Sequence, residues 1–187
     1  MAIVGDGSAA AVQSRRRFPR RPRWPASVVL GVVALVIAVG CAPPPPRPPT
    51  HFGPIPVHFS SPNMGRDLPV YRGIDMPTLN LGGAGWDDFS SALLEPGTVV
   101  LFAHRVSHGG PFRTLDQLHP GNVVFITGSD SRTYVYEVIN TVITGPSWAE
   151  ILAWKPPSGH GLTLVACHPP GSTRYRIVVH ADLFTVA

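Results

Sequence analysis

The stretch that decides the fold is residues 162–179, which read LTLVACHPPGSTRYRIVV. Leu162 to Val165 is apolar and β-prone, and Cys167 stands where this run ends. Pro169 to Ser172 cannot continue a central strand, so the chain is expected to turn there. Tyr175 to Val179 is again β-branched and aromatic. The sequence therefore predicts two adjacent strands, with a thiol at the end of the first.

Charged residues beside this thiol suggest a reactive site. Arg174 and Arg176 lead the second strand, and a guanidinium supplies positive charge and fixed donors for an oxyanion. Upstream, residues 97–105 read GTVVLFAHR, so His104 follows an apolar strand. A thiol needs a neighbouring base or a lowered pKa to act as a nucleophile at neutral pH, and His104 could be that base for Cys167.

Three motifs in this order resemble those of a sortase, the cysteine transpeptidase of Gram-positive cell surfaces. That family carries a strand ending in (G/A)-H-R, then T-L-x-T-C, then an Arg opening the next strand. The matches are Ala103-His104-Arg105, Thr163 to Cys167, and Arg176. Residues 110–122, GPFRTLDQLHPGN, resemble the family's P-F-x-x-L-x-x-L-x-x-G-D segment. The resemblance covers residues 59–183, and the combination is specific where each motif alone is weak.

Details of the motifs refine this resemblance. Ala166 stands where the family usually has Thr, and residues 59–70 match the family's opening segment only weakly, with Ser61 in an apolar position. The short loop after Cys167 is most similar to class E sortases of high-GC actinobacteria. Their signals tend to carry L-A-x-T-G in place of L-P-x-T-G.

The resemblance implies an all-β fold, a closed β-barrel of about eight strands with one or two short helices. It implies that Cys167 is the nucleophile, that His104 is the general acid and base, and that Arg176 positions substrate and stabilises the oxyanion. Arg174 is the second choice for that last role. Sorting-signal peptides would be cleaved at a Thr–Gly bond through a thioester, and the acyl group would pass to an amine of a cell-wall precursor or a pilin. No cofactor and no metal is expected.

Other residues near Cys167 are predicted to contact substrate, and the site also has alternative interpretations. Ala166, His168 and Val178 are predicted substrate contacts. His104 and His108 have the i,i+4 spacing of a zinc pair but lack the Glu of H-E-x-x-H, so a metal site is not predicted. Cys167 could instead be an inert buried thiol. The alternative function is a membrane-tethered β-barrel binding module with an inactive sortase-like site.

Composition agrees with an all-β domain rich in turns. The 187 residues include 22 Pro and 19 Gly, and no long amphipathic helix is visible. The remaining predicted elements are strands at 99–103, 123–127, 133–140 and 141–144, and short helices at 86–94, 115–118 and 148–154. The two cysteines, Cys41 and Cys167, lie in different regions, so a disulfide framework is not expected.

The net charge of +4 comes from the N-terminal region. Six arginines lie within residues 15–23. From Pro48 onward the chain has eight Lys and Arg residues and ten Asp and Glu residues. The basic footprint expected for nucleic-acid binding is therefore missing from the predicted domain.

The N-terminal region predicts export and a membrane tether. Residues 1–25 form a basic region, in which SRRRFPR at 14–20 fits either a twin-arginine signal or a positive-inside flank. Residues 26–42 are apolar and predict an uncleaved anchor, or a lipoprotein signal in which Cys41 is lipidated. Residues 43–57 predict a proline-rich spacer, and 58–187 the catalytic domain. Both forms of tether place that domain outside the cell, on the membrane.

Overall fold

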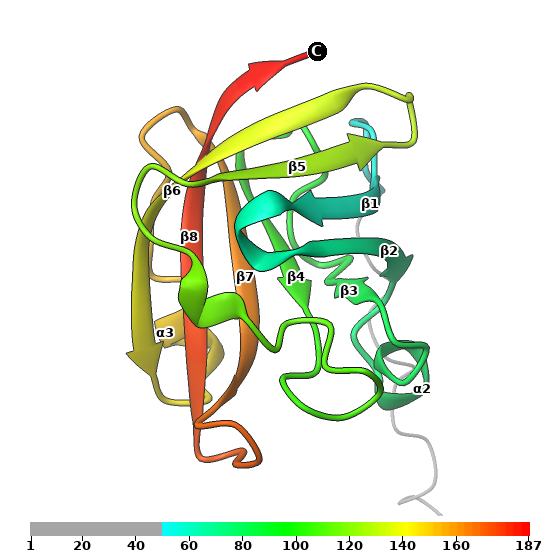
Figure 1. The fold of residues 1–187 in the computed structure, drawn as a ribbon. Helices are drawn as coiled ribbons and strands as arrows, with labels where there is room; N and C mark the ends of the chain where they lie inside the picture. Colours follow the sequence, from blue (N-terminus) through cyan, green and yellow to red (C-terminus); the bar gives the residue numbers. More distant parts are fainter. Residues whose placement is uncertain (1–49) are drawn as a thin grey trace, which may run out of the picture. The chain divides into compact units, whose positions relative to one another are not determined.

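The computed structural model describes residues 50–187, so the predicted basic region, the apolar segment with Cys41 and most of the spacer lie outside the described residues. Eight strands and four short helices follow one another along the chain (Figure 1). In chain order they are β1 (Pro56–Ser61), η1 (Pro62–Met64), β2 (Arg66–Arg72), α2 (Met76–Leu79), β3 (Ala84–Trp86), β4 (Gly97–Phe102), η2 (Leu115–Gln117), β5 (Val123–Gly128), β6 (Thr133–Thr144), α3 (Trp148–Ile151), β7 (His160–His168) and β8 (Tyr175–Val186).

The strands close into one barrel in the order β1-β2-β3-β4-β7-β8-β6-β5, and β5 pairs back onto β1. The pairs β2–β3 and β4–β7 are parallel, and the other pairs are antiparallel. Each strand of the described barrel therefore has a neighbour on both sides, although the short β3 pairs only with Val70–Arg72 of β2 and with Leu101 and Phe102 of β4. The prediction of an all-β closed barrel of about eight strands with short helices is confirmed. None of the helices within residues 50–187 is long and apolar enough to cross a membrane.

The side chains of β7 alternate between two environments, as the pleat of a strand requires. Leu162, Leu164 and Ala166 belong to the main core cluster, which fills the barrel. Val165 belongs to a second, smaller cluster with Val100, Val178 and Ile151 of α3. That second cluster lies on the outer face of β4, β7 and β8, where α3 covers it.

The register of β7 with β8 extends this outer face. Thr163 pairs with His180, Val165 with Val178, and Cys167 with Arg176. Residues paired across an antiparallel ladder share a face of the sheet, so Cys167 lies on the outside of the barrel, away from the main core. Strand β7 runs on to His168, one residue past the cysteine.

One predicted helix is wrong. Residues 86–94 form no helix, because Trp86 ends β3 and the chain then turns. The Asp87 carboxylate accepts a hydrogen bond from the Phe89 amide (3.2 Å), and the Ser90 hydroxyl bonds to the Asp87 carbonyl and accepts from the Val100 amide (3.1 Å). Short polar side chains that bond to nearby backbone groups compete with a helix in this way.

The other predicted elements differ mainly in their lengths. The two strands predicted at 133–140 and 141–144 form the single strand β6, whose pairing with β8 is shifted between Val138 and Asn140. The predicted helix at 148–154 is the single turn α3, and the predicted helical turn at 115–118 is η2.

The residues that precede β1 are attached to the barrel. His51 pairs with Glu95 (Nδ1–Oε2, 2.8 Å), and the Phe52 amide donates to the same carboxylate (2.6 Å). Burial opposes the charge on Glu95, but the hydrogen bonds from the Ala92 amide, His51 and the Phe52 and Gly53 amides outweigh it and lower its pKa to about 2. Strand β1 begins at Pro56, inside the range 43–57 predicted for the spacer.

Candidate active site

Strand register brings the three predicted catalytic residues to one end of the barrel. In the parallel pair β4–β7, Phe102 lies opposite Val165, so two residues further on His104 is level with Cys167. In the antiparallel pair β7–β8, Arg176 lies directly opposite Cys167. All three half-buried side chains line one cleft of about 520 Å³.

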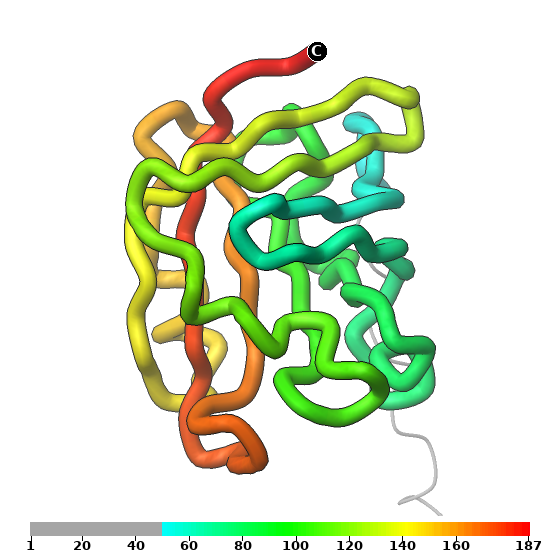
Figure 2. Tube along the Cα trace, viewed as in Figure 1, coloured from blue at the N-terminus to red at the C-terminus, as the bar shows by residue number. Residues whose placement is uncertain are grey.

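Three segments far apart in the sequence build the walls of this cleft. They are the chain around α2, the loop that follows β4, and the loop that joins β7 to β8, all traced in Figure 2. The first contributes Ile74, Met76 and Leu79, and the last contributes Gly171 to Thr173. One wall is therefore apolar and another is a polar turn, so the cleft offers both kinds of contact to a ligand.

His104 is held by a residue that the sequence did not single out. Its Nε2 lies 3.0 Å from Oδ1 of Asn80, the residue that ends α2. An amide oxygen only accepts, so Nε2 donates, and the lone pair of the neutral ring stays on Nδ1. Burial and the neighbouring His108 lower the pKa of His104, which keeps the ring neutral at pH 7.

His104 and His108, the pair with zinc-like spacing, stack on one another with ring centroids 4.9 Å apart. Across residues 50–187, no group of three or more His, Cys, Asp or Glu side chains is arranged to hold a metal ion.

The two candidate arginines are in different environments. Arg176 lies in β8, lines the cleft, and donates from one guanidinium nitrogen to the carbonyls of Thr173 (2.8 Å) and Tyr175 (3.0 Å). Arg174 precedes the strand, does not line the cleft, and lies over the ring of Tyr175 at 5.2 Å. The turn itself thus orients Arg176, whereas Arg174 is directed elsewhere.

Of the three predicted substrate contacts, only Ala166 lines the cleft. Ala166 borders the cleft, although it is almost completely buried and packs in the main core. His168 is half-buried and is not among the residues that line the cleft, and its Nδ1 has no partner within residues 50–187. Val178 is fully buried in the outer cluster below the cleft.

The residue after His104 has a structural role. Arg105 is 3% exposed, pairs with Asp116 (2.8 Å) and donates from Nε to the Arg113 carbonyl (2.8 Å). These bonds hold the loop after β4 against η2. The three apolar residues of the motif at 110–122, Phe112, Leu115 and Leu118, are all fully buried. The motif at 110–122 therefore anchors in the core the chain that follows the loop after His104.

Sequence reasoning missed α2 and with it Asn80. A signal was present: the Asp75 carboxylate caps the helix by accepting from the Thr78 amide (3.0 Å), and Pro77 lies in the first turn. An Asp cap followed by an early proline is typical of a helix start. The helix is only four residues long, which is too short to give a periodic pattern.

Comparison with known proteins agrees with these motifs. The Sortase domain family model matches residues 60–184, about two thirds of the chain. The chain is 32% identical over 129 residues to Sortase SrtE2 of Streptomyces coelicolor, which is 63% of this chain and 51% of the relative. It is also 32% identical over 91 residues to Sortase SrtE1 of the same organism, covering 44% of this chain and 25% of that protein. The chain thus spans about half the length of the first of these relatives and a quarter of the second.

Solved structures share the fold. The SrtA sortase from Actinomyces oris has a TM-score of 0.63 at 21% identity, covering 79% of this chain and 89% of that one. Sortase E1 from Streptomyces coelicolor, solved with a tripeptide in its active site, has a TM-score of 0.62 at 24% identity, covering 74% and 93%. With the motifs, the barrel and the family match in agreement, the chain belongs to the sortase family.

Proposed function

We propose that this sortase is a cysteine transpeptidase that cleaves the Thr–Gly bond of an L-P-x-T-G or L-A-x-T-G signal and transfers the acyl group to an amine. The observation that carries the proposal is the row His104, Cys167 and Arg176, which strand register brings to one cleft. A base, a thiol and a fixed guanidinium in one cleft are the groups that covalent acyl transfer needs.

The first half-reaction would use Cys167 as the nucleophile. Its sulfur attacks the Thr carbonyl carbon, and its proton passes to Nδ1 of His104, which is free because Nε2 donates to Asn80. The tetrahedral oxyanion is stabilised by Arg176. As the C–N bond breaks, His104 returns the proton to the leaving Gly amine, and a thioester remains on Cys167.

The second half-reaction would reverse these steps with a different amine. An amine of a cell-wall precursor or a pilin attacks the thioester, His104 takes its proton, and the thiolate leaves and is reprotonated. Exchanging an amide for a thioester and then for a new amide conserves the acyl energy, so no ATP or cofactor is required. A neutral His104, which its lowered pKa favours, suits the role of base in both halves.

The peptide that the cleft would bind is proposed from the class of the relatives. The relatives SrtE2 and SrtE1 support an alanine-containing signal, because the loop after Cys167 resembles that of class E sortases. The tripeptide in the active site of Sortase E1 supports a short extended peptide as the ligand of the corresponding cleft here.

A membrane tether completes the proposal. The apolar segment 26–42 would act as an anchor, or Cys41 would carry a lipid, and either would hold the domain on the outer side of the membrane. Mass spectrometry of the protein purified from its own membrane distinguishes the two, because a diacylglycerol on Cys41 would exclude the uncleaved anchor.

The experiment that tests the reaction is incubation with L-A-x-T-G and L-P-x-T-G peptides plus an amine, read by mass spectrometry. We expect a product joined at Thr to the amine, and covalent labelling of Cys167 by a thiol-reactive substrate mimic. Peptide binding without cleavage or labelling would instead support the alternative, a tethered binding module with an inactive site.

A further inference from the structure

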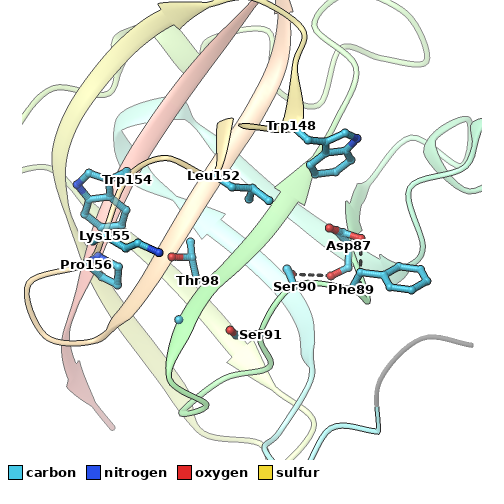
Figure 3. A pocket seen from close by; sticks show the side chains of 11 residues that line it. Asp87, Phe89, Ser90, Ser91, Thr98, Trp148, Leu152, Trp154, Lys155 and Pro156 are labelled. Carbon is cyan, nitrogen blue, oxygen red and sulfur yellow. Dashed lines mark hydrogen bonds between the residues drawn. The ribbon is translucent and has the colours of Figure 1, made fainter. Parts of the chain in front are cut away.

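A second pocket lies on the outer side of the barrel, between the turn after β3 and the chain around α3 (Figure 3). Its volume is about 420 Å³, and Thr98 of β4 contributes to its floor. Phe89, Trp148 and Leu152 line it and are unusually exposed for large apolar side chains, at 58%, 45% and 44%. Three such side chains gathered around one hollow are typical of a binding surface.

A buried carboxylate lies within this apolar pocket. Asp87 is only 7% exposed, and its Oδ1 accepts from the Phe89 amide (3.2 Å). Within the described part of the chain no side-chain bond or ion pair engages its Oδ2, and this oxygen is not among the fully enclosed atoms that lack a partner, so it is open to the pocket. Burial raises the pKa of Asp87, the Phe89 amide opposes this, and the adjacent Asp88 adds to it. A cation placed here would relieve the cost of burying this charge.

The charge in the pocket is divided between its two ends. In Figure 3 the Asp87 carboxylate lies on the side of Phe89 and Trp148, whereas Lys155 and Thr98 lie on the opposite side of the pocket. No ion pair joins Asp87 to Lys155 within residues 50–187. A ligand would therefore place its cation at the Asp87 end and a carbonyl or other acceptor at the Lys155 end.

The pocket adjoins the catalytic cleft. Trp148 packs edge-on against Phe102 (centroids 5.2 Å apart), and Phe102 lines the cleft with Cys167. The Asp87 amide donates to the carbonyl of Val100 in β4 (2.9 Å), and His104 follows Val100 by four residues, two residues past the end of β4. At about 3.3 Å per residue this separation is roughly 13 Å, which an extended peptide covers in about four residues.

We infer that this pocket, whose walls include Asp87 and Trp148, binds a lysine side chain in the segment of the protein substrate that flanks the sorting signal. The inference rests on the proposed function, because it assumes that a peptide occupies the cleft at Cys167. The peptide would pass over the exposed face of Trp148, and its lysine would direct its ammonium to Oδ2 of Asp87. Aromatic faces and a carboxylate together stabilise an ammonium on an apolar stem.

Lysine is favoured over arginine because of the acceptor geometry. Arg binds a carboxylate best through two parallel bonds to both oxygens, and one oxygen of Asp87 is already engaged by the Phe89 amide. A compact ammonium needs only the remaining oxygen. The pocket should therefore prefer lysine to arginine, and both to the uncharged isostere norleucine.

The test uses the full chain carrying Cys167→Ala, with fluorescent peptides that contain the sorting motif and one lysine moved through the flanking positions. Binding is measured by anisotropy, which needs no turnover. At one position, about four residues from the motif's Thr, lysine should bind roughly tenfold more tightly than norleucine, between the worth of an exposed and a buried charge pair. Asp87→Asn, which keeps an acceptor for the Phe89 amide, should reduce this preference to below about twofold.

Two further variants control for charge and for folding. Asp88→Asn removes the same charge from the adjacent residue, which pairs with Arg72 outside the pocket, and should leave the lysine preference unchanged. Lys155→Glu adds a carboxylate to the other end of the pocket and should strengthen the preference about threefold or more. This second variant tests the site even if Asp87→Asn does not fold.

The outcomes separate the two proposals. If the motif binds but lysine improves binding at no position, or the preference persists in Asp87→Asn, the lysine site is wrong while the proposed function stands. If no motif peptide binds and the unsubstituted protein cleaves none, both fall together.

Discussion

A histidine lies toward each end of the outer face of β4, β7 and β8, and the two histidines differ in how far other parts of the chain cover them. We call the end with His104 the open end and the end with His180 the sealed end. At one end, half-buried His104 lies level with Cys167 and Arg176 in an open cleft. At the other, His180 is 4% exposed, bonds through Nδ1 to the Thr163 hydroxyl (3.1 Å), and stacks on Trp154 with centroids 4.8 Å apart.

The difference is made by what covers the sheet. The chain from α3 to Trp154 lies over His180 and packs on Val165 through Ile151, but none of its residues lines the cleft at Cys167. Burial lowers the pKa of both histidines, that of His180 to about 4. In the cleft this gives a neutral ring that lines an open site, as the proposed role of His104 as a base requires, whereas under Trp154 it gives a neutral ring that serves packing. The same residue type is thus accessible or enclosed according to what covers it.

The largest expected effect separates these two ends directly. Cys167→Ala should abolish cleavage and transpeptidation without changing the melting temperature, because this side chain lies outside the main core. Thr163→Val, two residues earlier on the same face, should keep kcat/KM within about twofold and instead cost about 1–2 kcal/mol by leaving His180 without its partner. Peptide turnover and chemical denaturation measure both effects. Turnover near the unsubstituted level in Cys167→Ala would exclude Cys167 as the nucleophile.

The next effect concerns the open end alone. Arg176→Ala should lower kcat/KM by about 10²–10³, the usual loss when a fixed oxyanion donor is removed. Arg174→Ala should lose less than about tenfold, because Arg174 precedes β8 and is directed over Tyr175. Arg176→Lys should recover little, since a point-charge ammonium cannot replace the fork of fixed donors of a guanidinium. A greater loss in Arg174→Ala, measured with the same peptide, would move the role to Arg174.

The sealed end should be visible in the pH dependence of stability. The folded pKa of His180 is about 4, below its ordinary value of 6.5, so the unfolded chain takes up this proton first as the pH falls. This contribution to the free energy of unfolding is complete above about pH 6.5 and is lost toward pH 4, at most about 3 kcal/mol.

Denaturation of two variants isolates that contribution. His180→Phe should flatten the slope between pH 6.5 and pH 4, whereas replacing the exposed His119 by Gln should leave it as it is. An unchanged slope in His180→Phe would mean that His180 is protonated in the folded barrel.

Sequence alone predicted the parts of this comparison that depend on local pattern. The β-branched runs around Cys167 and Arg176 predicted adjacent strands, and motif order predicted the barrel. The helix at 86–94 was wrong because Asp87 and Ser90 bond to nearby backbone, which no hydrophobic pattern reveals. Asn80 was missed because its contact with His104 joins residues 24 positions apart. The burial of His180 under Trp154 likewise depends on how the chain after α3 packs on the barrel, which the local sequence does not indicate.

The smallest predicted effect tests how the open end orients its histidine. Asn80→Ala removes the acceptor that fixes Nε2 of His104 as the donor and leaves the ring free to rotate or change tautomer. We expect kcat/KM to fall about five- to tenfold, roughly the worth of one hydrogen bond, with little change in the melting temperature.

Three variants distinguish this positioning role from a packing role. Asn80→Asp keeps an acceptor and adds a negative charge, which stabilises the protonated ring of His104. The acid limb of the pH–rate profile should therefore shift to higher pH. Leu81→Ala changes the exposed neighbour outside the cleft and should leave both the rate and the profile unaltered. If Asn80→Asp and Asn80→Ala share the unsubstituted profile, His104 is oriented by its stacking on His108, and His108→Ala should then carry the loss.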